Sequence, residues 1–296
     1  MPEHSRLPYV WMVCGACSFA AMSTQVTLLG PRLDWQTIAV VRAGLAMVFA
    51  AGLAVAGGAK LVYFRPATLW MRSLAGSGAL ISGFFSLTRM RTTEVLTLTN
   101  MFPIWVALLS WPLLGVRPRR DVWGAVVCGV VGVVLMQQPR LEEGNYLWLI
   151  ALGSSLFSAV ALIGLHKLQG IDPRAVVAHF SAVSLAFCVV AWLVFPRRGL
   201  PLVLQWEVAG LLLGVGVTAT AGQILLTKAF AAGEPGKVSV VGLSQVGFGM
   251  VFELLLGGQA YNGTTLAGIA LVLAPTAWLM LRRPLKRMAT APTDGT

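Results

Sequence analysis

The sequence consists of long apolar blocks separated by short polar segments. An apolar block of about 20 residues is long enough to cross the hydrocarbon core of a bilayer as a helix. The blocks lack the alternation of apolar and polar residues that is typical of an outer-membrane barrel, so helices are predicted rather than strands. Ten such blocks can be delimited: 9–29, 37–56, 69–87, 93–115, 122–138, 146–167, 174–195, 207–230, 238–257 and 264–281.

The segments between the blocks are short and carry turn residues, for example Gly30-Pro31 and Asn262-Gly263. None of them is long enough to form a soluble domain. The first block follows Arg6, as in a signal peptide, but it is longer than the roughly 7–15 apolar residues of a typical signal sequence, so it is predicted to be the first span. The tail 282–296 is basic, then polar, and is predicted to be cytoplasmic and disordered.

Composition agrees with a membrane protein. Of the 296 residues 57% are hydrophobic and 11% are charged, whereas soluble domains carry roughly 25% charged residues. The net charge of +11 would suggest nucleic-acid binding in a soluble protein, but the basic residues lie in the short loops. We therefore interpret the charge as a topology signal and expect no nucleic-acid partner.

The distribution of lysine and arginine predicts the orientation of the chain. With both termini in the cytoplasm, fourteen of these residues fall on the inner side and six on the outer side. The remaining two, Arg42 and Arg72, lie within or at the edge of apolar blocks and are counted on neither side. An excess of positive charge on the cytoplasmic side is the usual arrangement, so we predict an even number of spans with both termini inside.

The two halves of the chain repeat each other weakly. When the second half is aligned on the first, Gly15 and Phe19 fall on Gly153 and Phe157, and with a slightly larger offset Val95 falls on Val238. We predict two repeats, 1–138 and 146–281. Because each holds an odd number of five spans, the second copy inserts upside down, and such inverted repeats build a site near the bilayer midplane. The alternative is a chance match between helices of similar composition.

Several short segments carry a family resemblance. They are Arg42, Asn100-Met101-Phe102-Pro103 and Leu114-Gly115 in the first half, and Ser154-Ser155-Leu156-Phe157, His166-Lys167-Leu168, Asp172-Pro173 and Gly233-Glu234-Pro235 in the second. With these the chain resembles the drug/metabolite transporter superfamily in its ten-helix EamA-like branch. Members often carry a glutamate where this chain has Val116 and Gln259, and the common Trp-Gly of the first span is missing around Cys17-Ser18.

The resemblance implies a secondary active transporter that exports amino acids, amines or related metabolites, driven by proton exchange or by the substrate gradient. We expect an all-α, multi-pass protein of the cell (inner or plasma) membrane that is a monomer or a homodimer, with a small-molecule substrate, protons and the lipid bilayer as partners. We expect no enzymatic activity, cofactor or metal.

Two alternatives remain open. A nucleotide-sugar or phosphate exchanger of the same superfamily would need lysine or arginine in the middle of its spans, and such residues are nearly absent. An intramembrane lipid-modifying enzyme would need clustered acids, histidines or metal ligands. His166 and Asp172 form the nearest such pair and match no known pattern.

Three residues are candidates for coupling transport to protons. Glu253 is the only acidic residue deep in an apolar block, and burial of a carboxylate in hydrocarbon costs at least ~2.5–3.5 kcal/mol, so it should face a cavity or a partner. Arg42 lies at a similar depth and could pair with it. His179 could relay protons, or could be a packing histidine.

Polar residues in the spans are candidates for lining the substrate cavity. Asn100 and Gln245 lie at similar depths from opposite faces, which suits hydrogen bonds to a solute or between helices. Pro103 within its span could mark a bend used in gating or a static kink. The other cavity candidates are Ser18, Trp105, Ser158 and Gln223.

Small residues at four-residue spacing predict close helix packing. They include Gly124, Cys128 and Gly132 in the fifth block, and could serve rocking or dimerising faces as well as ordinary packing. The Cys14-Gly-Ala-Cys17 spacing occurs in redox and metal sites, but in a spanning helix it more simply supplies small packing side chains.

Overall fold

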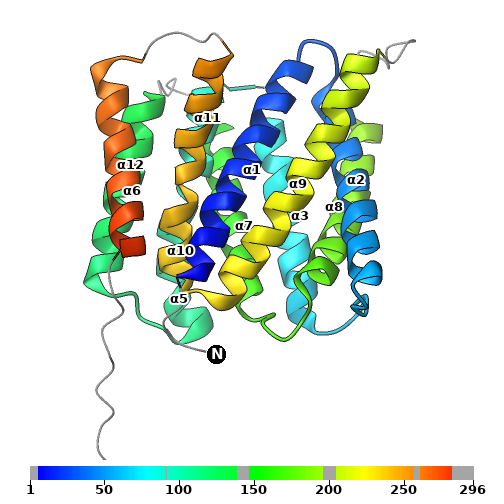
Figure 1. Ribbon diagram of the computed structural model, residues 1–296, viewed down its shortest axis with the longest axis horizontal. Coiled ribbons are helices and arrows are strands. Elements are labelled where there is room, and N and C mark those ends of the chain that lie inside the picture. The colour runs from blue at the N-terminus through cyan, green and yellow to red at the C-terminus, as the bar shows by residue number, and fades with distance from the viewer. Residues whose placement is uncertain are drawn as a thin grey trace, which may run out of the picture.

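The computed structural model describes residues 6–87, 89–90, 92–138, 147–195, 205–256 and 261–281, and the regular secondary structure of this part of the chain is entirely helical (Figure 1). The predicted tail 282–296 and Gln259 lie outside the described residues. The twelve described helices are α1 (Leu7–Leu29), α2 (Trp35–Ala56), α3 (Ala67–Leu87), α4 (Thr92–Thr99), α5 (Phe102–Leu114), α6 (Arg120–Gln137), α7 (Leu147–His166), α8 (Pro173–Val194), α9 (Trp206–Ala232), α10 (Pro235–Gly242), α11 (Ser244–Leu255) and α12 (Gly263–Leu281).

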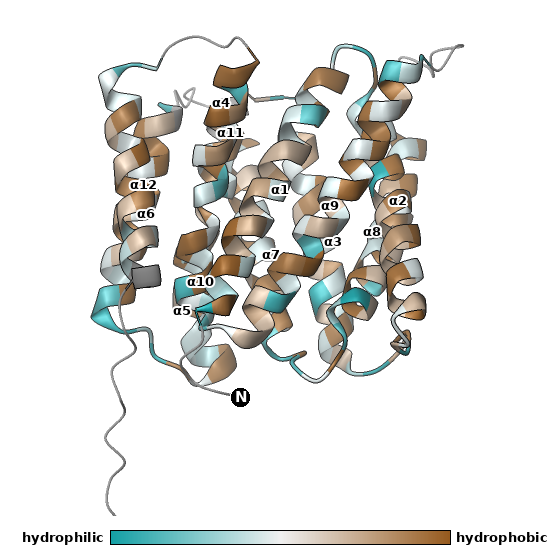
Figure 2. Ribbon diagram, viewed as in Figure 1, coloured by the Kyte–Doolittle hydropathy of each residue, from teal (hydrophilic) through white to brown (hydrophobic). Residues whose placement is uncertain are grey.

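Seven segments of the described chain are long and apolar enough to cross a membrane. They are α1, α2, α7, α8, α9, the α4–α5 segment Val95–Leu114 and the α10–α11 segment Pro235–Leu255. Figure 2 shows apolar residues along the length of the helices and polar residues mainly in the turns between them. The protein is therefore a multi-pass membrane protein.

The remaining three helices are shorter or more polar. Arg72 and several serines interrupt the apolar sequence of α3, and Arg120 and Asp121 occupy the first turn of α6. In α12 the apolar stretch is shorter, Gly263–Trp278. Each of these helices coincides closely with one of the predicted blocks, so the sequence located them correctly.

The helices pack in pairs that are far apart in the sequence. α1 packs on α9, α2 on α8, α3 on α7 and α6 on α12. Glycines allow two of these pairs to approach closely: a Cβ on Gly222 would lie 2.9 Å from a ring carbon of Phe19, and one on Gly132 would lie 2.8 Å from the carbonyl oxygen of Gly268. By contrast, a Cβ on Gly124 would meet nothing within 4 Å. Of the small residues predicted for packing in α6, Gly132 forms a close helix contact.

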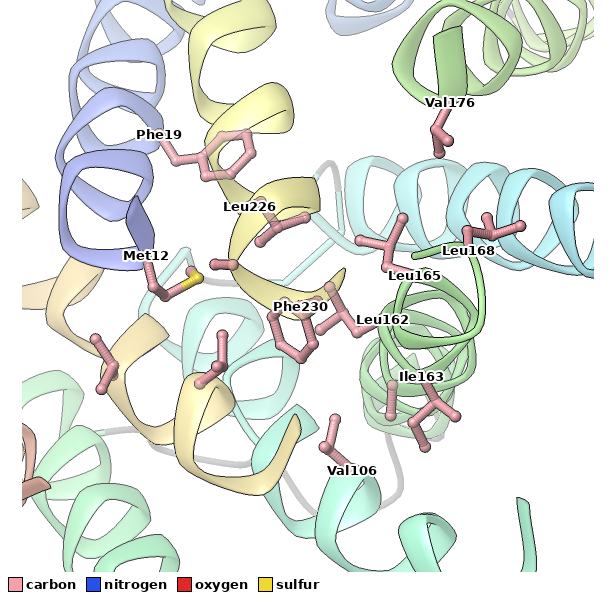
Figure 3. Packing of buried hydrophobic residues seen from close by; sticks show 14 of the residues in the cluster. Met12, Phe19, Val106, Leu162, Ile163, Leu165, Leu168, Val176, Leu226 and Phe230 are labelled. Atoms are coloured by element: carbon pink, nitrogen blue, oxygen red, sulfur yellow. The ribbon is translucent and has the colours of Figure 1, made fainter. Parts of the chain in front are cut away.

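A large apolar cluster joins both halves of the chain near the end of the bundle where α1 begins and α9 ends. Figure 3 shows Met12 and Phe19 of α1 beside Leu226 and Phe230 of α9, with side chains of α5, α7 and α8 around them. A smaller cluster around Leu29 and Val215 joins α1, α2 and α9 near their opposite ends. Apolar contacts thus hold the two halves together on both sides of the middle of the bundle.

The start of α8 is fixed by a charged cap. The Asp172 carboxylate accepts hydrogen bonds from the backbone N–H of Arg174 (2.8 Å) and from its Nη2 (2.8 Å), and Pro173 supplies the first helical residue. Arg174 Nη1 also donates to the carbonyl oxygen of Leu53 at the end of α2 (2.9 Å). These bonds join the ends of two paired helices.

Asp172→Ala is expected to lower the stability of the protein by about 0.5–2 kcal/mol at neutral pH, as the loss of a helix cap usually does. The hydrogen bonds from Arg174 hold the pKa of the Asp172 carboxyl below its ordinary value of 3.8. The contribution of the charged Asp172 cap to stability is therefore complete above pH 3.8 and is lost as the pH falls through the lowered pKa. Thermal unfolding of both proteins in detergent between neutral and acidic pH measures it. Asp172→Asn keeps the cap without the charge and should be the milder change, and equal stability of all three proteins would contradict the expectation.

Candidate functional site

Two helices are interrupted at corresponding positions of the two halves. α4 ends at Thr99 and α5 begins at Phe102, while α10 ends at Gly242 and α11 begins at Ser244. The alignment of the halves that places Val95 on Val238 also carries Asn100 onto Leu243. Interrupted spans in corresponding positions are typical of transporter substrate sites. At Leu243 the interruption is slight, since the backbone stays right-handed helical and the N–H donates to the carbonyl oxygen of Val240 (3.1 Å).

The first interruption is stabilised by its own side chain. Asn100 Nδ2 donates to the carbonyl oxygen of Leu96 (2.7 Å), so part of its hydrogen-bonding capacity is used within the chain. Pro103 is the second residue of α5, where its missing N–H leaves no helical bond unmade. The predicted bend or kink therefore lies just before Pro103, and its use in gating stays a prediction. Pro112 is the proline inside α5.

Trp105 links α5 to the first helix of the second half. Its Nε1 donates to Ser155 Oγ (2.8 Å), and Ser155 donates to the carbonyl oxygen of Leu152 (2.6 Å). Three other cavity candidates, Ser18, Ser158 and Gln245, are half-buried, and their side chains form no hydrogen bond to another described residue. That these three side chains line a substrate cavity stays a prediction.

Gln223 and Arg72 form a buried polar contact between helices of the two halves. Arg72 of α3 is 3% exposed, and its Nη2 donates to Gln223 Oε1 of α9 (2.9 Å). The guanidinium also lies over the ring of Phe180, 4.0 Å from its centroid. Arg72 Nε is buried without a hydrogen-bond partner. The sequence identified Gln223 but missed Arg72, because a basic residue near the start of an apolar block resembles a loop residue.

Arg42 of α2 is a second buried cation. It is 9% exposed, and its Nε donates to the sulfur of Met22 (3.2 Å), a weak acceptor. No carboxylate of the described residues forms an ion pair with Arg42 or Arg72. A charged side chain at the centre of a spanning helix costs about 2.5–3.5 kcal/mol on insertion scales, so such residues mark functional sites.

Glu253 lies elsewhere than expected. It is two residues before the end of α11, and its side chain is exposed rather than buried. Its partner is Tyr261, whose hydroxyl donates to Glu253 Oε2 (3.4 Å) and to the carbonyl oxygen of Met250 (2.7 Å). Burial and the neighbouring Glu253 carboxylate raise the pKa of Tyr261. The predicted pairing of Glu253 with Arg42 is therefore wrong, and a role of Glu253 in proton coupling stays a prediction.

His179 is held by contacts on both ring nitrogens. Nδ1 is 2.8 Å from Ser73 Oγ, Nε2 is 3.0 Å from the carbonyl oxygen of Tyr63, and the ring meets Trp70 edge-on. One turn further along α3, Ser77 bonds Ser184 of α8 across 2.9 Å. These contacts join α3 to α8 and support a packing role for His179.

The residues considered for catalysis or metal binding are separated. In the described part of the chain no three His, Cys, Asp or Glu side chains lie close enough to share a metal ion. His166 Nδ1 is 3.1 Å from the carbonyl oxygen of Phe230, while Asp172 caps α8. Cys14 and Cys17 are free thiols on α1.

Comparison with known proteins gives the class of the protein. Residues 6–137 match the EamA-like transporter family. The chain is 26% identical over 225 residues to an uncharacterized transporter of Helicobacter pylori (74% of this chain, 75% of that one). It is 27% identical over 207 residues to the pseudopaline exporter CntI of Pseudomonas aeruginosa (69% and 71%), and 23% identical over 238 residues to human solute carrier family 35 member G1 (73% and 62%).

A solved crystal structure shares the fold, with a TM-score of 0.80 at 15% identity over 91% of this chain and 95% of that one. Residues 6–137 form an EamA-like domain, and the relatives that cover most of the chain are named as transporters, an exporter and a solute carrier. The protein is therefore a membrane transporter with a small-molecule substrate, and not an enzyme.

Proposed function

We propose that the protein is a secondary active transporter that exports a small organic metabolite by alternating access between two inverted repeats. The observation that carries this proposal is the pair of interrupted helices at Asn100 and Leu243, which occupy equivalent positions when the halves are aligned. In secondary transporters such breaks meet near the midplane, where they expose backbone groups to the substrate. Relatives named as a transporter and as an exporter support transport, with export as its direction.

The pairing of the helices supports two repeats, 1–138 and 146–281. The two halves correspond helix by helix: α1 to α7, α2 to α8, α3 to α9, α5 to α11 and α6 to α12. When each helix is replaced by its counterpart, the α1–α9 contact becomes the α7–α3 contact, and the α2–α9 contact becomes the α8–α3 contact. Likewise α1–α11 becomes α7–α5, while α2–α8 and α6–α12 are unchanged. Each of these contacts is present in the structure. A two-fold relation between the halves accounts for this pattern.

The ends of the chain support an even number of crossings. The first turn of α1 and the last turns of α12 lie at the same end of the bundle (Figure 1). If α3, α6 and α12 also cross, the chain has ten spans, and the excess of basic residues favours a cytoplasmic position for both termini. In this arrangement the cluster around Met12 and Phe230 closes the cytoplasmic end, and the one around Leu29 and Val215 closes the outer end. Transport then requires the two clusters to open in turn.

Solute flux tests the proposal. Purified protein reconstituted in liposomes should move labelled solutes saturably, and unlabelled solute on the opposite side should accelerate the exchange. A panel of amino acids, amines, nucleosides and organic acids covers the metabolite classes. Flux that does not exceed that of empty liposomes for every solute would overturn the proposal.

Proton coupling is a separate part of the proposal, and Glu253 is the residue to test. It is the acidic residue within the described segment Pro235–Leu255, and Tyr261 holds its carboxylate. Glu253→Gln should abolish the dependence of uphill flux on a pH gradient while downhill exchange persists, because the helix breaks are untouched. Tyr261→Phe should keep the dependence in a weakened form. If uphill flux through Glu253→Gln in proteoliposomes depends on the pH gradient as it does in the wild type, Glu253 does not carry the coupled proton.

A further inference from the structure

The buried arginines Arg42 and Arg72 have more donors than the protein satisfies. A guanidinium group carries five N–H donors and a full positive charge. The described residues offer Arg42 one thioether sulfur, and they offer Arg72 one amide oxygen and the face of one ring. All of these partners are uncharged. The pair therefore lacks both acceptors and negative charge.

The two arginines lie on either side of the middle of the bundle. Arg42 is well inside α2, so its Cα is about 21 Å from the end of that helix, at about 1.5 Å per residue. The Arg72 guanidinium lies against Gly76, about 14 Å from the same end of the bundle. By the same measure the break at Asn100 is about 20 Å from this end and the break at Leu243 about 12 Å. Each cation thus shares its depth with one helix break.

The packing around Arg72 orients its guanidinium group. Phe180 covers one face of the plane, and Gln223 binds Nη2. The close approach of Gly76, on which a Cβ would clash with Arg72 Nη1, fixes the side chain along α3. The Nε edge has no partner. A planar guanidinium held in this way is suited to two parallel hydrogen bonds with an oxyanion.

We propose that Arg42 and Arg72 bind the anionic group of the transported solute, so that the substrate is a small organic anion bearing a carboxylate or phosphate group. The inference rests on the proposed function and deepens it by naming the class of substrate. It reverses the sequence-based argument against phosphate exchangers, which relied on the near absence of arginine within spans. Gln223 acts as a positioning residue that holds Arg72 for the anion.

Ligand-induced stabilisation of the purified full-length protein in detergent tests the inference. The probes are acetate, succinate and inorganic phosphate, with L-alanine and putrescine as zwitterionic and cationic comparisons, all at the same ionic strength. We expect the anions to raise the Tm and the other two probes to leave it unchanged. The organic acids and inorganic phosphate distinguish a carboxylate site from a phosphate site. A shift with L-alanine or putrescine alone, or no shift with any anion, would overturn the inference.

Variants separate a built site from weak surface binding. Arg42→Gln and Arg72→Gln should each lower the affinity for the anion at least tenfold, and Arg72→Lys should retain part of it. Arg32→Gln is the control, because Arg32 is an exposed cation paired with Glu207. Its anion binding should equal that of the wild type. If Arg72→Gln does not elute as a folded protein in gel filtration, Arg42→Gln and Arg72→Lys decide the question. Undiminished anion binding in them would contradict the inference.

Flux measurements keep this inference distinct from the proposed function. Saturable flux of L-alanine or putrescine, without flux or binding of any anion, would leave the transporter intact and refute the anion site. Anion binding that requires both arginines, without flux of any solute, would uphold the site and refute the proposed transport. Anion flux that falls at least tenfold in Arg42→Gln supports both.

Discussion

Gly132→Ala and Gly268→Ala are each expected to destabilise the protein by about 1–3 kcal/mol, as overpacking of a tight contact does. A Cβ on Gly268 would lie 2.6 Å from the carbonyl oxygen of Gly132 and 2.8 Å from the backbone N of Met136. A Cβ on Gly132 would lie 2.8 Å from the carbonyl oxygen of Gly268. These neighbours are backbone atoms, so α6 and α12 must separate to admit a methyl group.

Thermal unfolding in detergent measures this effect, and Gly124→Ala is the matched control on the same helix. A Cβ on Gly124 would meet nothing within 4 Å, and alanine favours the helix by about 1 kcal/mol over glycine. The control should therefore be neutral or stabilising. Equal stability of Gly132→Ala and Gly124→Ala would show that the close α6–α12 contact contributes nothing to the folded state.

Gly76→Ala is expected to reduce transport at least tenfold while the protein stays folded. The new Cβ would clash with Arg72 Nη1 and would lie 2.7 Å from a ring carbon of Phe180. Both atoms belong to side chains, so the strain is relieved by moving the guanidinium away from Gln223. A tenfold loss corresponds to about 1.4 kcal/mol, less than the cost of leaving a charged donor poorly paired.

Gly78→Ala, two residues along the same helix, is the control for this change. Its Cβ would meet Phe157 at 3.7 Å, an ordinary van der Waals distance. Initial rates of solute flux in proteoliposomes, normalised to the amount of folded protein, should separate the two variants. Wild-type flux in Gly76→Ala would mean that the orientation of Arg72 has no part in transport.

The positions of the helices could be predicted because lipid contact imposes a simple rule on the sequence. Each predicted apolar block contains a helix or a pair of helices in the structure. The break between α10 and α11 could not be predicted, because no proline lies near Leu243, and glycine and single polar residues such as its neighbours Gly242 and Ser244 also occur in continuous spanning helices. Pro103 indicated the first break, although it lies just after the break rather than at it. Hydropathy reports the surroundings of a segment and not the continuity of its backbone.

The candidate site was predicted in part. Gln223, Trp105 and Arg42 were identified because polar side chains are rare in apolar helices, and the structure gives each of them a buried or half-buried position. The pairing of Arg42 with Glu253 failed because depth along a helix does not determine which helices are neighbours. Arg42 contacts Met22 of α1, whereas Glu253 contacts Tyr261, just before α12.

The α6–α12 pair has a consequence for how the protein is made. Gly132 and Gly268 are separated by nearly half of the chain. At ribosomal rates of about 5–20 residues per second, the partner of α6 emerges roughly 7 to 27 s after α6 itself. During this interval α6 lacks the helix that it finally packs against. Its sequence begins with Arg120 and Asp121, and α6 is not among the seven segments that are long and apolar enough to cross a membrane. A nascent chain truncated before α12 should therefore hold α6 less firmly in the membrane than the full-length protein does.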